Sequence, residues 1–191
     1  MKTKNKKKFI IIVGKSASGK TTLADYLCKR FGYRKYKTTT TRPMRKGETW
    51  KDYNFISTKR FLNKLSKNEF IEYKSYNVFN NGVDDTWYYG TPILKHFKFN
   101  PFKYVIVLTL DGAIEFANYY GNENCEMIYL DCPNDMREVR ARFRSKGNFD
   151  MKEWKRRLKA DDEDFPIDKV KHYCRIIDVT DKYVEDIAEE I

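Results

Sequence analysis

The residues best suited to chemistry lie near the N-terminus, in the segment Gly14–Thr21 (GKSASGKT). This segment matches the pattern G-x-x-x-x-G-K-[ST], and it lies between the apolar run Phe9–Val13 and a segment with helical spacing of apolar residues. Small residues here allow backbone N–H groups to close around phosphate oxygens, and a helix N-terminus adds further free donors. We therefore predict a phosphate-binding loop whose contacts come from Gly14, Ser16, Ala17, Ser18, Gly19, Lys20 and Thr21.

Two side chains of this loop should act on a nucleoside triphosphate directly. Lys20 is expected to reach the β- and γ-phosphates of ATP, and the hydroxyl of Thr21 is expected to bind the accompanying Mg²⁺. Such loops occur in kinases, GTPases, helicases and transporters, so the motif alone leaves the reaction open. The chain has no NKxD-type guanine-reading motif, which disfavours a GTPase, and it is short for a motor ATPase.

A second candidate for anion binding is the polar segment Thr38–Glu48 (TTTTRPMRKGE). Arg42 and Arg45 lie three residues apart, and an arginine side chain can grip a phosphate with two N–H groups. The nearby Tyr53 could donate one more hydrogen bond. On this segment alone, an exposed basic loop is the alternative interpretation.

The hydrophobic pattern predicts the elements that must hold these side chains in position. Short apolar runs predict buried strands at 9–13, 104–110, 127–130 and 174–177. Helical spacing predicts helices at 20–31, 113–120, 135–144, 151–164 and 182–191. Strands that alternate with helices imply an α/β fold with a mostly parallel sheet flanked by helices.

Residues 33–95 interrupt this alternation. They are rich in Tyr, Thr, Asn and Phe, and we expect them to form a small β-rich insertion. One helix is expected at 58–66, with Ser57 as its N-cap, because a serine oxygen can accept from an N–H of the first turn. The tripeptide Asn80–Gly82 is typical of a turn.

Length and charge limit the classes of function. A chain of 191 residues is expected to form one domain. Its net charge of +11 is confined to two segments: Met1–Lys8 has five lysines and no acidic residue, and 137–157 has nine basic and three acidic residues. We expect residues 1–8 to be a disordered basic tail. Because the charge is local, we expect no specific binding to nucleic acid.

The longest clearly apolar run, Phe9–Val13, is too short to span a bilayer or to form a signal-peptide core. We therefore expect a cytoplasmic protein without membrane association. The four cysteines lack metal-ligand spacing, so we expect reduced thiols, mostly in the core. The oligomeric state is left open.

Beyond the phosphate loop, the chain resembles the guanylate kinase family. The pattern TTR-x-x-R-x-GE over Thr40–Glu48, followed by DYxF over Asp52–Phe55, is that family's signature for binding a nucleoside monophosphate. The resemblance covers nearly the whole chain, because further matches follow in the expected order at 68–72 (NEFIE), 87–92 (WYYGTP), 139–147 and 155–158. It implies transfer of the γ-phosphoryl group of ATP to GMP, and to dGMP, with GDP and ADP as products.

The resemblance also implies an organisation for residues 9–191 as a single guanylate-kinase-like domain. A P-loop kinase core would comprise residues 9–32, 96–135 and 166–191. A small β-rich insertion at 33–95 would bind the nucleoside monophosphate, and a helical lid would cover about 136–165.

The resemblance assigns the acceptor nucleotide to residues of the insertion. The acceptor phosphate would be held by Arg42, Arg45, Tyr53 and Tyr89. Glu72 would accept hydrogen bonds from N1 and the 2-amino group of guanine, while Thr38 and Thr91 would contact the O6 side. Without the family context, Glu72 is more simply an exposed charge.

Catalysis would depend on positive charge around the transferring phosphate. The resemblance implies catalytic roles for Lys20, Arg42, Arg142 and Arg157, with Arg142 also contacting ATP. Lys146 stands where the family usually has another arginine. We expect the remaining arginines of this segment to be surface charges or a general electrostatic attraction for nucleotide: Arg137, Arg140 and Arg144.

Other positions have an alternative interpretation or depart from the family pattern. Asp111 matches a family aspartate near the Mg²⁺ and the acceptor, although a helix N-cap is an equally simple interpretation. Thr109 replaces a usual acidic residue, and 73–87 is longer than usual. Ile176–Asp178 lacks the family's asparagine.

Three alternative functions follow from the same residues. A related kinase could use another small phosphorylated acceptor. Guanylate-kinase-like domains also occur as non-catalytic binding modules, but these typically lack an intact phosphate loop, which is present here. The positive net charge suggests nucleic-acid binding, yet no recognisable RNA- or DNA-binding motif accompanies it.

Overall fold

The computed structural model of the protein describes residues 7–45, 47–80 and 83–191. The chain divides into two compact units: the core unit, Met1–Lys35 with Phe102–Ile191, and the insertion unit, Tyr36–Pro101. Most of the expected tail, residues 1–6, lies outside the described residues, as do Asn81 and Gly82 of the expected turn.

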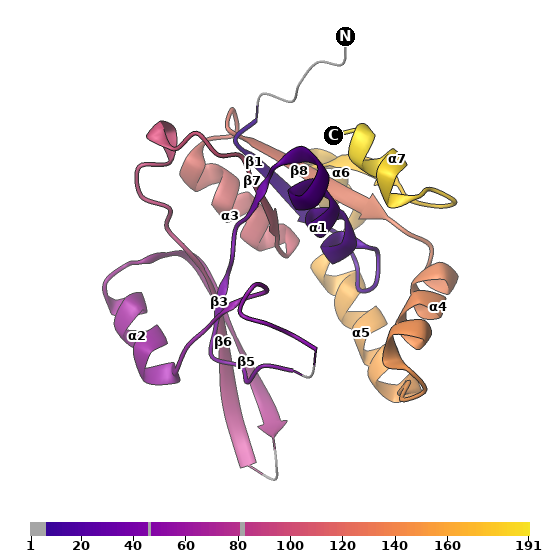
Figure 1. Cartoon of the computed structure of the whole chain (residues 1–191). Helices are drawn as coiled ribbons and strands as arrows, with labels where there is room; N and C mark the ends of the chain where they lie inside the picture. Colours follow the sequence, from indigo (N-terminus) through magenta and orange to yellow (C-terminus); the bar gives the residue numbers. More distant parts are fainter. Residues whose placement is uncertain (1–6, 46, 81–82) are drawn as a thin grey trace. The chain divides into compact units, whose positions relative to one another are not determined.

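A five-stranded sheet with the strand order β2-β7-β1-β8-β9 forms the centre of the core unit (Figure 1). All its registered strand pairs are parallel. The residues of β1 are all buried, which explains why this strand is a continuous apolar run. The strands are β1 (Phe9–Val13), β2 (Arg34–Lys35), β7 (Tyr104–Val107), β8 (Cys125–Asp131) and β9 (Arg175–Asp178).

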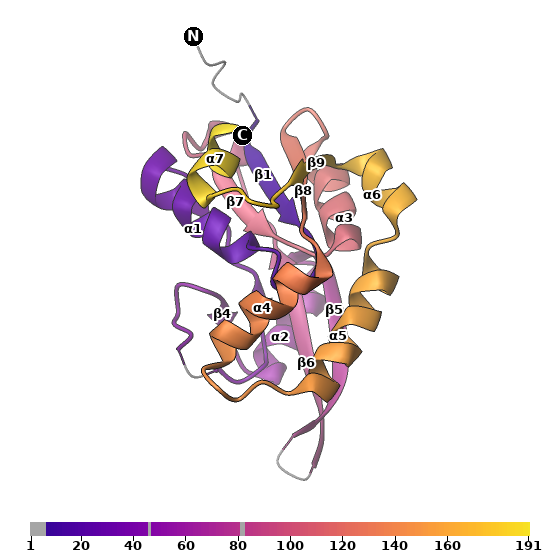
Figure 2. The same ribbon diagram turned by 90° about the vertical axis from the view of Figure 1, so that its right-hand side faces the viewer.

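Helices cover both faces of this sheet, with α1 and α7 on one side and α3 and α6 on the other (Figure 2). Helices α4 and α5 follow β8 and lie side by side in both views. None of the helices in the described part of the chain is long and apolar enough to span a lipid bilayer. The helices of the core unit are α1 (Lys20–Phe31), α3 (Leu110–Tyr120), α4 (Asn134–Ser145), α5 (Met151–Asp164), α6 (Ile167–Tyr173) and α7 (Val184–Glu189).

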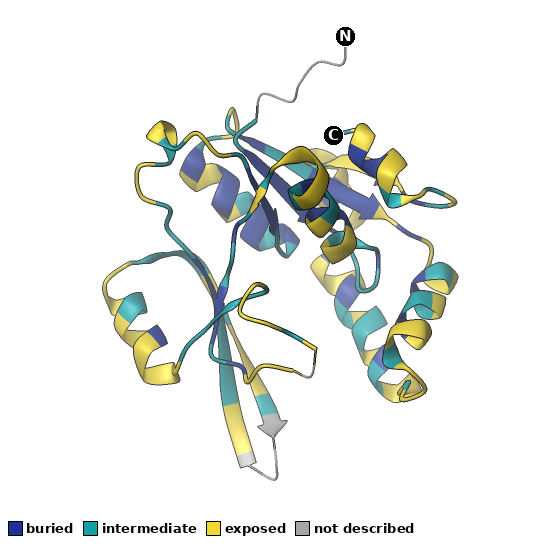
Figure 3. Cartoon of the chain, in the orientation of Figure 1, coloured by how far each residue is buried: buried dark blue, intermediate teal, exposed yellow. Residues whose placement is uncertain are grey.

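Alternate residues of β1 pack against opposite layers of helices. Ile10 and Ile12 belong to the buried cluster that includes α1 and α7. Phe9 instead stacks on Tyr120 and meets Phe116 edge-on, both in α3. Buried residues are accordingly concentrated on the central strands and the inner sides of these helices (Figure 3). This packing fixes the carboxyl end of β1, where the predicted phosphate loop begins.

The insertion unit contains a four-stranded sheet with the order β4-β3-β6-β5 and one α-helix, α2 (Thr58–Ser66). Phe61 of α2 stacks on Phe70 of the sheet at a ring-centroid distance of 4.5 Å. A Cβ atom on Gly90 would lie 2.9 Å from both of these rings, so only glycine fits beneath them. The unit also has a 3₁₀ turn at Phe97–Phe99, and its strands are β3 (Thr39–Thr40), β4 (Asn54–Phe55), β5 (Phe70–Asn80) and β6 (Val83–Pro92).

The expected α/β fold with a mostly parallel sheet and flanking helices is confirmed. Helices α1, α2 and α5 have the predicted bounds, and Ser57 caps α2 by accepting from the N–H of Arg60. The strand expected at 104–110 ends earlier, at Val107, because Thr109 caps α3 by accepting from the N–H of Gly112. The sequence patterns missed α6 altogether.

Candidate functional site

The segment Gly14–Thr21 forms a tight loop between β1 and α1, as its pattern predicts. Gly14 has a φ of 145°, and a Cβ atom there would lie 2.9 Å from Ser18 Oγ and 3.0 Å from the carbonyl oxygen of Leu130. Gly19, with a φ of 101°, is the N-cap of α1. Ala17 is also left-handed, at a φ of 62°. Left-handed residues of this kind are typical of loops whose backbone N–H groups bind anions.

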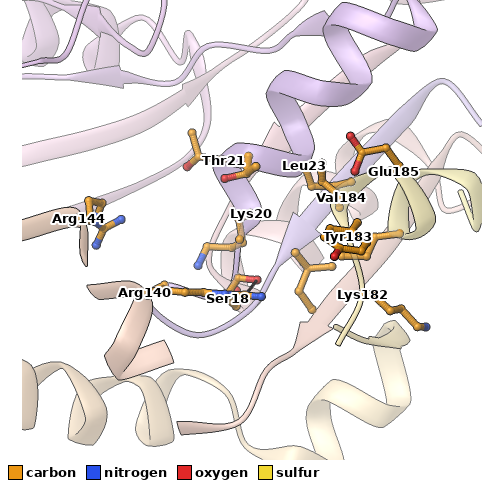
Figure 4. A pocket seen from close by; sticks show the side chains of 15 residues that line it. Ser18, Lys20, Thr21, Leu23, Arg140, Arg144, Lys182, Tyr183, Val184 and Glu185 are labelled. Atoms are coloured by element: carbon orange, nitrogen blue, oxygen red, sulfur yellow. Dashed lines mark hydrogen bonds between the residues drawn. The ribbon is translucent and has the colours of Figure 1, made fainter. Parts of the chain in front are cut away.

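Lys20 curls back over this loop. Its Nζ donates to the carbonyl oxygens of Gly14 and Lys15, each at 2.7 Å. Burial lowers the pKa of Lys20 to about 8, the nearby Asp161 carboxylate opposes this shift, and Arg137 adds to it. The ammonium group is thus held at the loop by two carbonyl oxygens. Thr21 is exposed in the first turn of α1, next to Lys20 (Figure 4).

A cavity of about 500 Å³ opens beside the loop, entirely within the core unit. This volume lies within the usual range for small-molecule sites, roughly 300–1,000 Å³. Its wall combines the first turn of α1 with basic side chains of α4 and with the segment that enters α7 (Figure 4). The lining residues outside the loop include Leu23, Leu130, Arg140, Arg144, Lys182, Tyr183, Val184, Glu185 and Ile187.

The arginines of α4 differ from one another in position. Arg140 Nη1 donates to Ser18 O at 3.3 Å, and Arg144 lines the cavity. Arg137 is fully buried, so the expectation of a surface charge is wrong for this residue. It could not be distinguished by sequence, because its partner Asp161 lies on another helix, α5.

Arg142 and Arg157, which the resemblance assigns to catalysis, are both paired with glutamates of their own helices. Arg142 pairs with Glu138 at 2.7 Å, and Arg157 Nε donates to Glu153 at 2.8 Å. Neither is among the residues that line the cavity beside the loop. Their catalytic roles therefore remain predictions.

Arg42 lies at the centre of a polar cluster in the insertion unit. Its Nη1 and Nη2 donate to the two carboxylate oxygens of Glu48 at 2.9 and 2.8 Å, and its Nε donates to Tyr89 Oη at 3.0 Å. The hydrogen bond from Arg42 lowers the pKa of Glu48, so the pair stays ionised. The guanidinium also lies 5.5 Å from the ring of Tyr53, whose pKa is raised by burial. Tyr53 thus keeps its phenol proton and can donate it.

Strand pairing brings further predicted residues to this face of the sheet. Glu72 of β5 lies directly opposite Thr91 of β6, and the Thr91 hydroxyl donates to Glu72 Oε1 at 2.5 Å. Thr91 and Tyr89 are two residues apart on β6, so they share a face. Thr38 immediately precedes β3, and Arg45 is exposed in the following loop, where its N–H donates to Glu48. Seven of the eight predicted acceptor-binding residues therefore belong to the insertion unit. Arg42 lies against Tyr53 and Tyr89, and Glu72 contacts Thr91.

Asp111 is the one predicted substrate-binding residue in the core unit. It lies in the first turn of α3, where its carboxylate pairs with Lys169 at 2.5 Å. The alternative interpretation of Asp111 as a helix N-cap is wrong, because Thr109 has that position. Its predicted contact with the acceptor stays a prediction.

Several residues that shape the two clusters were not assigned individually from the sequence. Glu48 belongs to the TTR-x-x-R-x-GE pattern, so the sequence did contain a signal for this residue. Its carboxylate accepts from Arg42 and orients the guanidinium group. Asp161 accepts from both the N–H and the hydroxyl of Ser16. No short motif marks Asp161, because its role depends on the packing of α5 beside the loop.

Comparisons with known proteins find similarity to guanylate kinases. The family model described as guanylate kinase matches residues 6–86. The chain is 31% identical over 141 residues to a guanylate kinase of Clostridium tetani. The aligned segment covers 72% of this chain and 62% of that protein. It is 28% identical over 155 residues to a guanylate kinase of Chlorobaculum tepidum, covering 79% of this chain and 74% of that one. The chain thus spans less than two thirds of the first relative's length and more of the second's.

Solved structures extend the similarity to the whole fold. A guanylate kinase from Anaplasma phagocytophilum is similar with a TM-score of 0.62 at 26% identity, covering 97% of this chain and 83% of that one. A gluconokinase from Sinorhizobium meliloti shares the fold alone, with a TM-score of 0.50 at 12% identity. A parallel sheet with this loop between its central strand and a helix is the arrangement of P-loop nucleotide-binding proteins, a class that includes kinases. Among these proteins, the chain is similar to members of the guanylate kinase family.

Proposed function

We propose that this protein is a guanylate kinase, which transfers the γ-phosphoryl group of ATP to GMP and dGMP and releases ADP. The observation that supports this proposal is the presence of two distinct polar clusters, one in each unit, at the two sets of predicted phosphate-binding residues. One is the loop with Lys20 at its mouth, and the other is the Arg42 cluster with Glu72 on the same sheet. A binding module that had lost catalysis would have no need for the first cluster.

ATP is assigned to the loop of the core unit. The backbone N–H groups of the loop bind the β- and γ-phosphates, and Lys20 exchanges its carbonyl partners for phosphate oxygens. The base and ribose extend into the adjoining cavity, where Arg140 and Arg144 add positive charge. This charge favours the triphosphate over uncharged nucleosides.

The residues present also fit Mg²⁺. The hydroxyl of Thr21 is an exposed oxygen in the first turn of α1, and Mg²⁺ prefers oxygen ligands supplied by one or two protein groups together with phosphates and water. When bound with ATP, the ion would neutralise charge that develops on the phosphate oxygens.

GMP is assigned to the insertion unit. The phosphate of GMP would bind Arg42 and Arg45, with phenol protons from Tyr53 and Tyr89. Glu72 would accept from N1 and the 2-amino group of guanine, and Thr91 orients the Glu72 carboxylate by donating to it. Adenine lacks these two donors, so it would leave the carboxylate unpaired, which is a strong basis for discrimination. Thr38 completes the assigned base contacts on the O6 side.

Transfer needs alignment and charge stabilisation more than a covalent catalyst. Arg42, Arg142 and Arg157 are assigned to this task together with Lys20, and Asp111 is assigned to the acceptor. Arg142 and Arg157 would first have to leave their glutamate partners. We also propose that the enzyme works in the cytoplasm, together with its nucleotide substrates.

The proposal is tested by measuring ATP consumption against a panel of monophosphates. A coupled assay of ADP release with GMP, dGMP, AMP, CMP and UMP should show turnover with the two guanine nucleotides and little with the others. Chelation of Mg²⁺ with EDTA should abolish it. Turnover that is independent of GMP, or faster with AMP, would contradict the assignment of the acceptor.

The buried amine of Lys20 predicts how nucleotide affinity depends on pH. Because burial lowers its pKa to about 8 in the nucleotide-free protein, Lys20 loses its proton as the pH rises through that value. We expect the Kd for ADP to rise by up to about tenfold per pH unit above pH 8. Calorimetric titrations with ADP between pH 7 and pH 9.5 would measure this, and a constant Kd would contradict it.

The free energy of unfolding should increase with pH, whereas the affinity for ADP should decrease. Unfolded lysine has a pKa of about 10.4, whereas folded Lys20 has a pKa of about 8. Between these values the unfolded chain holds the extra proton, so folding becomes more favourable as the pH rises. Urea unfolding of the wild type and of Lys20→Met isolates this contribution, because the variant should lack it.

A further inference from the structure

A buried ion pair lies directly behind the phosphate loop. Arg137 of α4 is fully buried, and its Nη1 donates to Asp161 Oδ2 of α5 at 2.6 Å. Its Nη2 donates to Asn134 Oδ1 at 2.6 Å, and its guanidinium lies 5.8 Å from the ring of Trp154. Asp161 is also buried. The pair joins α4 and α5 at a largely buried place.

Both members of this pair also contact Ser16 in the loop. The N–H of Ser16 donates to both carboxylate oxygens of Asp161, at 3.0 and 2.9 Å, and the Ser16 hydroxyl donates to Oδ1 at 3.0 Å. Arg137 Nη1 donates to the carbonyl oxygen of Ser16 at 3.1 Å. The backbone of Ser16 is therefore held on both sides, its donor by the carboxylate and its acceptor by the guanidinium.

Because peptide groups are planar and none here is cis, these contacts orient the neighbouring residues as well. Fixing the N–H of Ser16 turns the carbonyl of Lys15 the opposite way, and that carbonyl accepts from Lys20 Nζ at 2.7 Å. Fixing the carbonyl of Ser16 likewise sets the direction of the N–H of Ala17. Ala17 itself is left-handed, a conformation that residues other than glycine adopt reluctantly.

Stability alone gives a weak reason for such a pair. Two charges removed from water lose hydration, and apolar side chains of similar volume often replace a buried ion pair without loss of stability. Both carboxylate oxygens of Asp161 and Nη1 of Arg137 instead contact a single loop residue, Ser16. We propose that Arg137 and Asp161 are positioning residues that hold the phosphate loop in its nucleotide-binding shape, acting through the two peptide groups of Ser16.

This inference rests on the proposed function only in taking the loop as the ATP site. It predicts that loss of the pair weakens binding of the donor nucleotide and leaves the acceptor alone. Without the pair, Lys20 and the N–H of Ala17 would no longer be held where they can bind the phosphates of the nucleotide. The residues assigned to GMP belong to the insertion unit, apart from Asp111, whose carboxylate pairs with Lys169.

The double variant Arg137→Met with Asp161→Leu tests this directly. It replaces the pair by apolar side chains of similar size, so thermal unfolding should stay close to that of the wild type. The Kd for ADP, measured by calorimetry, should nevertheless rise about tenfold or more, because Ser16 has lost its charged partners. The KM for ATP should rise in parallel, while the KM for GMP should not change. Glu163→Gln, an exposed acid-to-amide change on the same helix, is the matched control and should bind ADP as the wild type does.

A folded double variant with wild-type affinity for ADP would overturn the proposal, as would an equal loss in Glu163→Gln. If the double variant does not fold, Arg137→Lys decides the matter, since it keeps the charge and removes the fork that reaches the Ser16 carbonyl. It should also weaken ADP binding, and unchanged affinity in this folded variant would overturn the proposal. Failure of the proposed function would look different, because a wild type that binds ADP but does not phosphorylate GMP leaves the ADP measurements intact.

Discussion

Replacing Lys20 with methionine should lower kcat for phosphoryl transfer from ATP to GMP by about a thousandfold, the upper end of what one preorganised charged donor contributes. The side chain lies at the mouth of the loop, and the change keeps an unbranched side chain, one atom shorter, while removing the charge. Stability should not fall, because burial already disfavours the ammonium and lowers its pKa. Steady-state rates and thermal unfolding of the purified variant would be measured together.

Lys29→Met provides the matched control for this variant. Lys29 lies in the last turn of the same helix, is exposed, and is remote in sequence from the loop. Its replacement should leave kcat unchanged. A Lys20→Met variant that folds and transfers phosphate at the wild-type rate would refute the assignment of the loop.

Glu72→Gln should raise the KM for GMP by about a hundredfold, which corresponds to ~2.7 kcal/mol. The carboxylate can accept from both N1 and the 2-amino group of guanine, whereas the glutamine amide offers one oxygen and opposes the second donor with an N–H of its own. The Thr91 hydroxyl can still donate to the amide oxygen, so the sheet should keep its pairing. Rates at varied GMP with saturating ATP would give this KM.

The KM for ATP reports whether the effect of Glu72→Gln is confined to the acceptor, and we expect no change in it. Glu69→Gln, the same substitution in the turn before β5, should behave as the wild type, since Glu69 contacts Lys64 at the surface. An unchanged KM for GMP in Glu72→Gln would remove Glu72 as the reader of the base.

The features predicted best from the sequence are those that depend on residues close together in the chain. The apolar run of β1, the glycines of the loop and the spacing of α1 are local signals, and all three are observed. Ser57 caps α2 for the same local reason. The family motif then extended these local signals to the acceptor residues of the insertion unit, of which the structure joins Arg42 to Tyr89 and Glu72 to Thr91.

Features that depend on distant partners could not be predicted in this way. Arg137 belongs to a repeating basic pattern that is typical of an exposed helix face, and only Asp161, on another helix, explains its burial. Helix α6 is short and has one buried side chain, Val170, so its hydrophobic periodicity is weak. Thr109 was recognised only as a departure from the family, whereas its hydroxyl caps α3.

The most direct test of the central claim follows the phosphoryl group itself. ATP labelled with ³²P in the γ-position would be mixed with GMP, Mg²⁺ and enzyme in molar excess over ATP, and the products would be separated by chromatography. Transfer from the loop to the acceptor predicts that the label appears in GDP, in step with the formation of ADP. Label found only in inorganic phosphate, with no labelled GDP at any time, would contradict the assignment of this protein as a guanylate kinase.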